Sequence, residues 1–303
     1  MKDFPSPHGD KLLALLENQN LPIDDKTRVE NAIERYNEWL KSLKSIKGTK
    51  ENVIAQMLKL LSEYKLFIDI ELIYDSTNNF LYRQKGQLKI DNTIIEEFLP
   101  IIINTLLKKS LNNLDISIGP ATCFSGIRFE SSLIHPQQGG GMKVREKDQD
   151  FAICRNLYIR SSYNSEFEKD ITTKTNIAYI VAECKTNLDK TMFQEAAATA
   201  LDVKMIVPSA KYFLLCEWLD MTPISSNTTA IDEIIILRKA KRISSNIRQD
   251  FNTYEKRQQQ RDYFINYLKT NPFSEETFDR LISHIEGVIK DSNEDEILKR
   301  GYF

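Results

Sequence analysis

A strongly apolar run from Ile177 to Ala182 ends abruptly in Glu183-Cys184-Lys185 and is followed by a polar turn. A short apolar run of this kind predicts a buried strand. Side chains alternate between the two faces of a strand, so Glu183 and Lys185 are expected on the same face. Burying charge there is costly unless a metal or a partner group compensates for it. The fold must therefore bring further polar groups to the end of this strand.

The 303 residues are enough for one large domain or two modest ones. No apolar stretch reaches the ~20 residues that span a bilayer. The first residues, Met1 to Pro5, lack the apolar core of a signal peptide. These features predict a soluble cytoplasmic protein with no membrane partner.

The four cysteines are spread along the chain with no close pair, which excludes zinc-finger spacing. Each lies in a strand-like stretch, so the sequence favours reduced thiols in the core. They are Cys123, Cys154, Cys184 and Cys216.

The formal net charge of −2 gives no global indication of nucleic-acid binding. Local basic clusters, at residues 238–242 and 143–147, could contact phosphates. For any single cluster, a solvated helix face is the commoner explanation.

The spacing of apolar residues predicts an α/β fold in which helical segments stand on both sides of a sheet. We expect a helical N-terminal region at 1–90, a catalytic core at 91–243 and a helical C-terminal region at 244–303. Within these regions, Ile68 to Tyr74 is expected to be extended, 139–141 to be a flexible loop, and Thr191 to Gln194 to form a capping box. The other expected elements are helices at 92–109 and 191–203 and strands at 114–118, 123–129, 151–159, 177–184, 212–215 and 234–237.

A second carboxylate is needed beside Glu183 if the pair is to hold Mg²⁺, which takes oxygen ligands, usually one or two carboxylates. The upstream candidates are Asp148, Asp150 and Asp170. If the strands at 151–159 and 177–184 are antiparallel neighbours, Asp150 meets Glu183 across the ladder. Asp170 then lies roughly 20 Å away at the far end. Asp148 remains the second choice.

Neighbouring residues suggest further roles. Lys185 could orient the attacking water and stabilise charge. The carbonyl of Cys184 could add a metal ligand, while its thiol points into the core. Gln194 and Glu195 open the next helix. Both could reach DNA or the metal. The alternative for Gln194 is the capping box, and the alternative for Glu195 is an ordinary first-turn carboxylate.

These stretches resemble a known family. Residues 147–153 and 182–185, followed by an alanine-rich helix and another strand, resemble the PD-(D/E)-x-K nucleases. Residues 80–88 and Ile118-Gly119-Pro120 resemble the type II restriction endonucleases that cut sites of the CCTNAGC kind, and the resemblance covers about residues 75–220. Gln149 replaces the proline of the motif, which leaves the choice between Asp148 and Asp150 open.

The resemblance implies a restriction-endonuclease-like core, a mixed sheet with flanking helices. It implies a type II site-specific deoxyribonuclease that uses Mg²⁺ to hydrolyse double-stranded DNA by in-line attack, leaving a 5′-phosphate and a 3′-hydroxyl. Asp150 and Glu183 would bind the metal with the carbonyl of Cys184, and Lys185 would activate water. A carboxylate from the 92–109 helix, Glu96 or Glu97, would join them.

Base reading in the major groove uses Arg, Lys, Asn or Gln. For each candidate, phosphate contact or plain solvation is the alternative. The candidate DNA-binding residues are Arg83, Gln84, Lys85, Arg128 and Gln194, with Gln137 and Gln138 as further possibilities. One site per chain also predicts a homodimer or a heterodimer with a related subunit, since a duplex break needs two cuts.

Three alternatives stay open on sequence grounds. The first is a structure-selective repair or recombination nuclease of the same fold. The second is a non-enzymatic DNA-binding protein in which Glu183 and Lys185 form a surface ion pair. The third is a phosphohydrolase of small molecules, which the absence of a Gly-rich phosphate loop disfavours.

Overall fold

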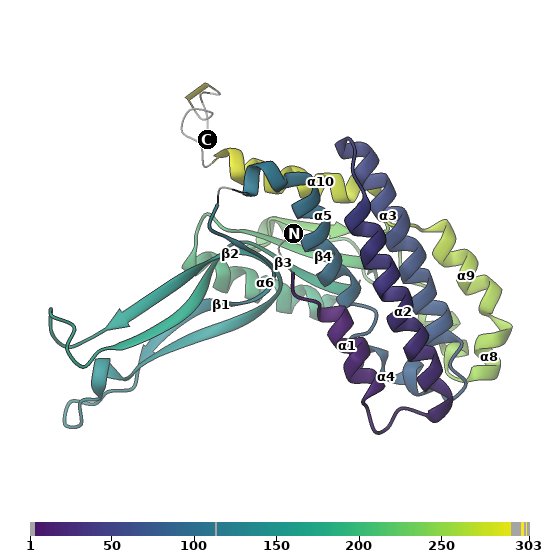
Figure 1. The fold of residues 1–303 in the computed structure, drawn as a ribbon, viewed down its shortest axis with the longest axis horizontal. Coiled ribbons are helices and arrows are strands. Elements are labelled where there is room, and N and C mark those ends of the chain that lie inside the picture. Colours follow the sequence, from purple (N-terminus) through teal and green to yellow (C-terminus); the bar gives the residue numbers. More distant parts are fainter. Residues whose placement is uncertain (1–3, 113, 292–297, 300, 302–303) are drawn as a thin grey trace.

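The computed structural model of the chain describes residues 4–112, 114–291, 298–299 and 301 (Figure 1). Helices make up its N-terminal part, as the apolar spacing predicts. Their aromatic side chains pack closely: the rings of Trp39 and Tyr64 stack at 4.6 Å. The helices are α1 (Pro7–Leu16), α2 (Ile23–Ser45), α3 (Lys50–Phe67), α4 (Phe80–Leu88) and α5 (Thr93–Leu111).

The segment Ile68–Tyr74 was expected to be extended, and this prediction is wrong: it is a π-helix, η1, that continues α3 directly. Apolar residues alternate with acidic ones in its first part, a pattern that a strand can also have. In the structure, Leu72, Ile73 and Tyr74 are all buried, so the segment is covered on several sides. A short apolar run does not distinguish a strand from a buried helical turn.

A mixed five-stranded sheet, in the order β1-β2-β3-β4-β5, forms the core of the described chain. The first three strands are antiparallel, whereas β4 and β5 run parallel to β3. The predicted antiparallel pairing of β2 and β3 is confirmed. The strands are β1 (Ser117–Phe129), β2 (Met142–Ser161), β3 (Ile171–Leu188), β4 (Lys211–Leu219) and β5 (Glu233–Ile236).

Apolar side chains cover both faces of this sheet. Phe151, Ala182 and Cys184 join one core cluster with Phe98 of α5 and with the N-terminal helices. Their sequence neighbours, such as Val181, face the other way and pack on α6 (Lys190–Ile206). The small side chains of that helix allow this close packing. The expected mixed sheet with flanking helices is thereby confirmed.

The outer parts of β1, β2 and β3 project from the body as an arm (Figure 1). The stretches predicted as separate strands at 114–118 and 123–129 form a single strand, β1, with irregular register. The amide of Asn176 on β3 donates to the carbonyl of Thr122 on β1 at 2.9 Å, which ties the two hairpins of the arm together.

The glycines at 139–141 belong to a 3₁₀ turn, η2 (Gln138–Gly141), rather than to a loop without structure of its own. Gly139 has φ +54°, and a side chain there would come within 2.7 Å of the carbonyl oxygen of Ser161. Glycine is required because no other residue fits this approach between the two hairpins.

The start of α6 also differs from the prediction. The helix begins at Lys190, and the side chain of Asp189 accepts a hydrogen bond from the N–H of Met192 at 2.9 Å. Asp189 is therefore the N-cap. The prediction of a capping box from Thr191 to Gln194 is wrong, because the N-cap lies about half a turn earlier, at Asp189.

Helices follow β5, as predicted. All four cysteines are free and buried, which confirms their expected place in the core. None of the helices in the described ranges combines the length and apolarity needed to cross a membrane. The C-terminal helices are α7 (Ser245–Arg248), α8 (Tyr254–Gln259), α9 (Arg261–Thr270) and α10 (Glu275–Asp291), and 3₁₀ turns stand at η3 (Ser226–Thr228) and η4 (Gln249–Phe251).

Candidate active site

Glu183 and Lys185 lie side by side on β3. The Nζ of Lys185 is 2.8 Å from Oε1 of Glu183, and both side chains are only partly exposed. Burial alone would lower the pKa of Lys185, but the hydrogen bond to Glu183 and its negative charge outweigh this and raise it. Lys185 is therefore a stable cation at neutral pH.

Asp150 reaches this pair through a β-bulge. Gly119 of β1 pairs with Ala152, and Ala121 pairs with Gln149, so two residues of β2 face the single residue Pro120. Proline has no N–H for the ladder, which favours an irregularity at this place. On the other side of β2, Phe151 pairs with Ala182. Asp150 thus stands level with Glu183, as the hairpin geometry predicts.

Between β2 and β3, the carboxylate of Asp150 accepts a hydrogen bond from a backbone N–H group of the neighbouring strand. Its Oδ2 accepts a hydrogen bond from the N–H of Cys184 at 2.9 Å. Burial raises the pKa of Asp150, and the charge of Glu183 adds to this, while the Cys184 N–H and Lys185 act in the opposite direction. Asp150 is therefore held at the Glu183-Lys185 pair, in a setting that disfavours its own negative charge.

A third carboxylate comes from α5. Glu96 is only 6% exposed, and its Oε1 accepts a hydrogen bond at 3.0 Å from the side-chain amide of Asn92. The same amide donates to the carbonyl of Cys184, also at 3.0 Å. Burial, followed by the charge of Asp150, raises the pKa of Glu96 to about 7. Asn92 thereby fastens the start of α5 to the end of β3.

Tyr212 supports Glu183 from the neighbouring strand β4. Its hydroxyl donates to Oε2 of Glu183 at 2.5 Å, and the tyrosine is fully buried. With Lys185 on Oε1, both oxygens of this carboxylate are engaged. Burial and the charge of Glu183 raise the pKa of Tyr212, so the phenol stays protonated as a donor.

The oxygen donors at this place suit a magnesium ion. Mg²⁺ is commonly held by one or two carboxylates, with water and substrate phosphate completing its shell. Asp150 and Glu183 supply two carboxylates, and the raised pKa of Asp150 indicates that a cation would be favourable there. Across the described ranges, no three His, Cys, Asp or Glu side chains converge closely enough to enclose a metal ion. Two carboxylates leave the rest of such a shell to water and substrate.

The other acidic candidates lie elsewhere. The exposed Asp148 accepts from the hydroxyl of Thr122 at 2.7 Å. Asp170 pairs with Arg160 at 2.7 Å on the outer arm. Glu97 accepts from the N–H groups of α1 at His8 and Gly9, at 2.9 and 3.2 Å, which makes it an anchor for that helix.

The predicted DNA-binding residues fall into three groups. Arg83, Gln84 and Lys85 share α4, and Gln194 is exposed in the first turn of α6. Arg128 lies near the outer end of β1, where it bonds to Glu130 at 2.9 Å. It pairs in register with Lys143, seven residues from Asp150 along β2, or about 23 Å. Arg128 is thus well separated from Asp150 and its neighbours Glu183 and Lys185.

Sequence reasoning missed two groups at this site, Tyr212 and Asn92. The run Tyr212 to Leu215 was recognised as a strand, but a tyrosine in an apolar strand is ordinarily a core residue. Asn92 was seen only as the start of a helix. No local pattern indicates that either side chain meets β3, because both contacts join segments far apart in the chain.

Comparisons with known proteins agree with this architecture. Among solved structures, the chain resembles the one described as "native BbvCI A2B2 tetramer at low resolution", with 18% identity and a TM-score of 0.56. The match covers 89% of this chain and 98% of that one, and at this identity it establishes the fold. A search of curated proteins finds no match.

A family model gives the more specific result. The model of the Bpu10I restriction endonuclease matches residues 87–303, a range that includes Glu96, Asp150, Glu183 and Lys185. This range is well over half of the chain. The chain therefore belongs to the Bpu10I restriction endonuclease family.

Proposed function

We propose that this type II restriction endonuclease cuts double-stranded DNA with Asp150, Glu183 and Lys185 as its catalytic residues and Mg²⁺ as its cofactor. The observation that carries the proposal is the hydrogen bond from the Cys184 N–H to Asp150 at 2.9 Å. It brings the second carboxylate to the Glu183-Lys185 pair, where a nuclease of this kind needs it.

Asp150, Glu183 and the carbonyl of Cys184 would hold the ion. When bound, Mg²⁺ neutralises charge on the phosphate oxygens and lowers the pKa of water. The Cys184 carbonyl already accepts one hydrogen bond from Asn92, and a carbonyl oxygen has a second lone pair to offer. Glu96 is the further carboxylate of the site.

The chain's own groups would orient the reaction. Lys185 would direct the attacking water and stabilise the charge that develops on the phosphate. Tyr212 would hold Glu183 in position through its short hydrogen bond. Attack in line with the leaving oxygen would leave a 5′-phosphate and a 3′-hydroxyl.

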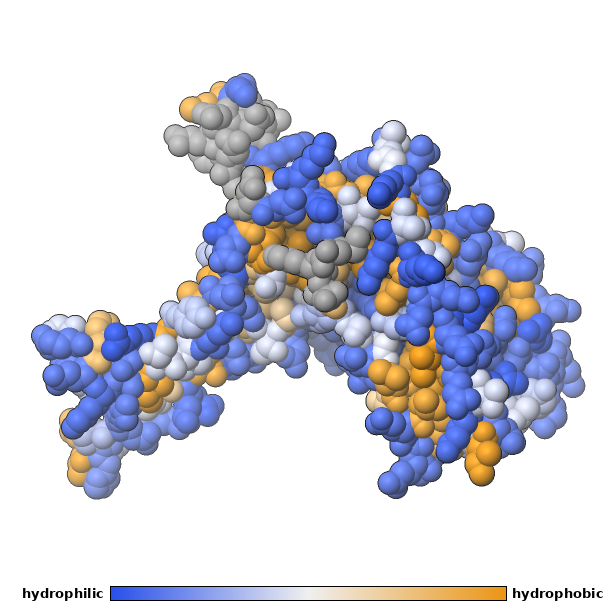
Figure 2. Space-filling view, in the orientation of Figure 1, coloured by the Kyte–Doolittle hydropathy of each residue, from blue (hydrophilic) through white to orange (hydrophobic). Residues whose placement is uncertain are grey.

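The duplex would lie against the concave side of the molecule, between the arm and the helical body (Figure 2). Residues Arg83, Gln84 and Lys85 of α4 and Gln194 of α6 would contact DNA beside the catalytic cluster, and Arg128 would contact it from the arm. The target would be of the CCTNAGC kind, as the resemblance of residues 80–88 suggests.

A break in both strands needs two catalytic sites. The structural relative is described as an A2B2 tetramer, which contains two kinds of subunit. We therefore propose that this chain works in an assembly, either with its own copy or with a related subunit. A purified chain that only nicks plasmid DNA would support the related subunit, and a linear product would argue for a homomeric enzyme.

The test is incubation of mixed-sequence plasmid DNA with wild type and Lys185→Ala, with and without Mg²⁺. Discrete products that require Mg²⁺ and disappear with the variant are expected. Products from wild type without any divalent ion, or undiminished cleavage by Lys185→Ala, would overturn the assignment of the site.

A further inference from the structure

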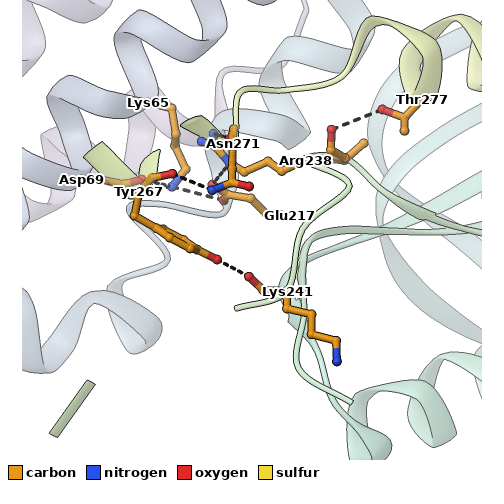
Figure 3. A network of polar contacts seen from close by, with 9 residues as sticks. Lys65, Asp69, Glu217, Arg238, Lys241, Tyr267, Asn271 and Thr277 are labelled. Atoms are coloured by element: carbon orange, nitrogen blue, oxygen red, sulfur yellow. Dashed lines mark hydrogen bonds and ion pairs between the residues drawn. The ribbon is translucent and has the colours of Figure 1, made fainter. Parts of the chain in front are cut away.

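A second group of charges brings Lys65, Asp69, Glu217 and Arg238 together (Figure 3). Glu217 lies on β4 beside the end of β3, and Lys65 lies on α3. Lys65 lies 2.7 Å from Asp69 and 3.2 Å from Glu217, and Arg238 lies 2.7 Å from Glu217. Two cations and two carboxylates thus compensate one another. This network needs no ligand to balance its charge.

Lys65 and Asp69 also line a pocket of about 70 Å³. Three further cations surround it: Lys85 from α4, and Arg242 and Arg248 from the segment after β5. The paired Lys65 and Asp69 thus share the lining with three further cations, which we call the rim cations, and with Asp91.

The cations of the rim are short of partners. Arg242 and Arg248 share one carboxylate, Asp220, at 2.9 and 3.4 Å. Lys85 pairs with no carboxylate in the described part of the chain and instead lies 4.8 Å from the centre of the Tyr82 ring. With Asp91 also lining the pocket, three cations face two carboxylates.

Burial disfavours the charged forms of these side chains. Burial is the largest cause that lowers the pKa of Lys85; the charges of Asp91 and Asp69 raise it, and the weaker effects of Lys65 and Arg242 lower it. Burial and then the charge of Arg242 lower the pKa of Arg248, against the effect of Asp220. An anion in the pocket would favour the charged forms of both groups.

The side chains of the pocket indicate which anion. Guanidinium and ammonium groups are the side chains that bind phosphate most strongly.

The pocket lies near the end of β3. Thr186, which lines it, directly follows Lys185 on β3 and points to the opposite face of the sheet, and Asp91, which also lines it, directly precedes Asn92. We propose that this pocket, with Lys85, Arg242 and Arg248, binds a backbone phosphate of the DNA strand at a nucleotide next to the one that is cut. The proposal rests on the proposed function and adds to it a defined phosphate subsite.

The salt dependence of DNA binding tests the subsite without cleavage. Binding of wild type and Lys85→Met to a mixed-sequence duplex is measured across a salt series in the absence of divalent ions. Each phosphate contact contributes about 0.9 to the slope of log K against log salt, so the variant should show a slope lower by about that amount. Methionine keeps the apolar stem on Tyr82, and Lys85→Arg should restore the slope.

The matched control is Lys59→Met, which removes an exposed lysine of α3 that pairs only with Glu63, at 4.0 Å. It should leave the slope unchanged. An unchanged slope for Lys85→Met, or an equal loss for both variants, would overturn the subsite.

A second measurement separates DNA from a free anion. Inorganic phosphate, at ionic strength matched with chloride, should raise the melting temperature of wild type more than that of Lys85→Met. Such a difference together with the lower slope supports the proposal. If phosphate raises the melting temperature of wild type more but the salt slopes are equal, the pocket binds free phosphate only. If phosphate raises both melting temperatures equally, the pocket binds no phosphate. Either result overturns the proposal.

Failure of the subsite and failure of the proposed function are distinguishable. If the subsite is wrong, wild type still cleaves with Mg²⁺ while Lys85→Met keeps the wild-type slope. If the catalytic assignment is wrong, Lys185→Ala cleaves normally whatever the slope of Lys85→Met.

Discussion

Two clusters of buried charge near the end of β3 differ in how they are balanced. In the network around Glu217, two carboxylates meet the cations Lys65 and Arg238. The interactions with both cations lower the pKa of Glu217 against the effect of burial, whereas burial keeps that of Asp69 raised. In the cluster of the proposed active site, the pKa values of Asp150 and Glu96 are both raised. The first network has as many cations as carboxylates, whereas the second places the carboxylates of Asp150, Glu183 and Glu96 around Lys185, as expected of a site that would bind a cation.

The largest effect should come from breaking the balanced cluster. Glu217 is only 2% exposed, and Glu217→Ala would leave Lys65 and Arg238 buried without their shared carboxylate. Removal of one partner of a buried pair typically costs about 3–5 kcal/mol. Denaturant unfolding should show a loss of this size. A loss below about 1 kcal/mol would mean that the network is not essential to the fold.

The corresponding change in the catalytic cluster should affect activity and leave stability intact. Glu183→Gln keeps the shape of the side chain but removes a negative charge that the proposed metal requires. Cleavage should fall at least about 100-fold. The control is Glu34→Gln, an exposed residue on α2, which should cleave like wild type. Equal activity of both variants would remove Glu183 from the mechanism.

Tyr212 shows a third way to stabilise a partly buried carboxylate, because its neutral hydroxyl donates to Glu183 where the other network uses cations. Tyr212→Phe should leave cleavage measurable but raise the Mg²⁺ concentration for half-maximal rate by about 10-fold, within the range for groups that support metal ligands. A merely structural tyrosine would lower the melting temperature without shifting this midpoint.

Substitution of Glu96 should have the smallest effect on the enzyme, and its effect on stability should depend on pH. Its pKa is about 7 in the folded chain, above its ordinary value of 4.5. Between these values the folded chain keeps a proton that the unfolded chain has lost, so this contribution to stability is complete below pH 4.5 and lost as the pH rises through 7. Glu96→Gln should remove this dependence and stabilise the metal-free protein at pH 8 by at most about 3 kcal/mol, the value that corresponds to the full shift. Thermal unfolding of both proteins at pH 5 and pH 8 measures it, and equal pH profiles would contradict the assignment.

Local patterns in the sequence predicted the parts of the site that depend on a single strand or hairpin. The apolar run before Glu183 indicated a core strand, and its alternation placed Lys185 beside Glu183, as the ion pair shows. Antiparallel pairing of β2 and β3 selected Asp150 over Asp170, because it places Asp150 opposite Glu183 and Asp170 at the far end of the hairpin. The bulge that lets Asp150 reach the Cys184 N–H was not foreseen, because it depends on Pro120 in the neighbouring strand.

The contacts that the sequence did not indicate are those between distant segments. Lys65 and Glu217 are ordinary surface residue types in their local context, and only the packing of α3 and η1 against β4 buries them together. The π-helix at Ile68–Tyr74 was missed for a related reason, since its alternation is also that of a strand. Patterns of period and spacing record which face is buried, but not which distant group lies opposite.

Binding of a divalent ion tests the central claim most directly. Mn²⁺, used as a spectroscopic substitute for Mg²⁺, is titrated into wild type, Asp150→Asn and Asp148→Asn. Wild type and Asp148→Asn should bind the ion alike, and Asp150→Asn should bind it at least 10-fold more weakly. Normal binding by Asp150→Asn together with loss in Asp148→Asn would contradict the account, because the carboxylate bonded to Cys184 would then not be the one that holds the metal.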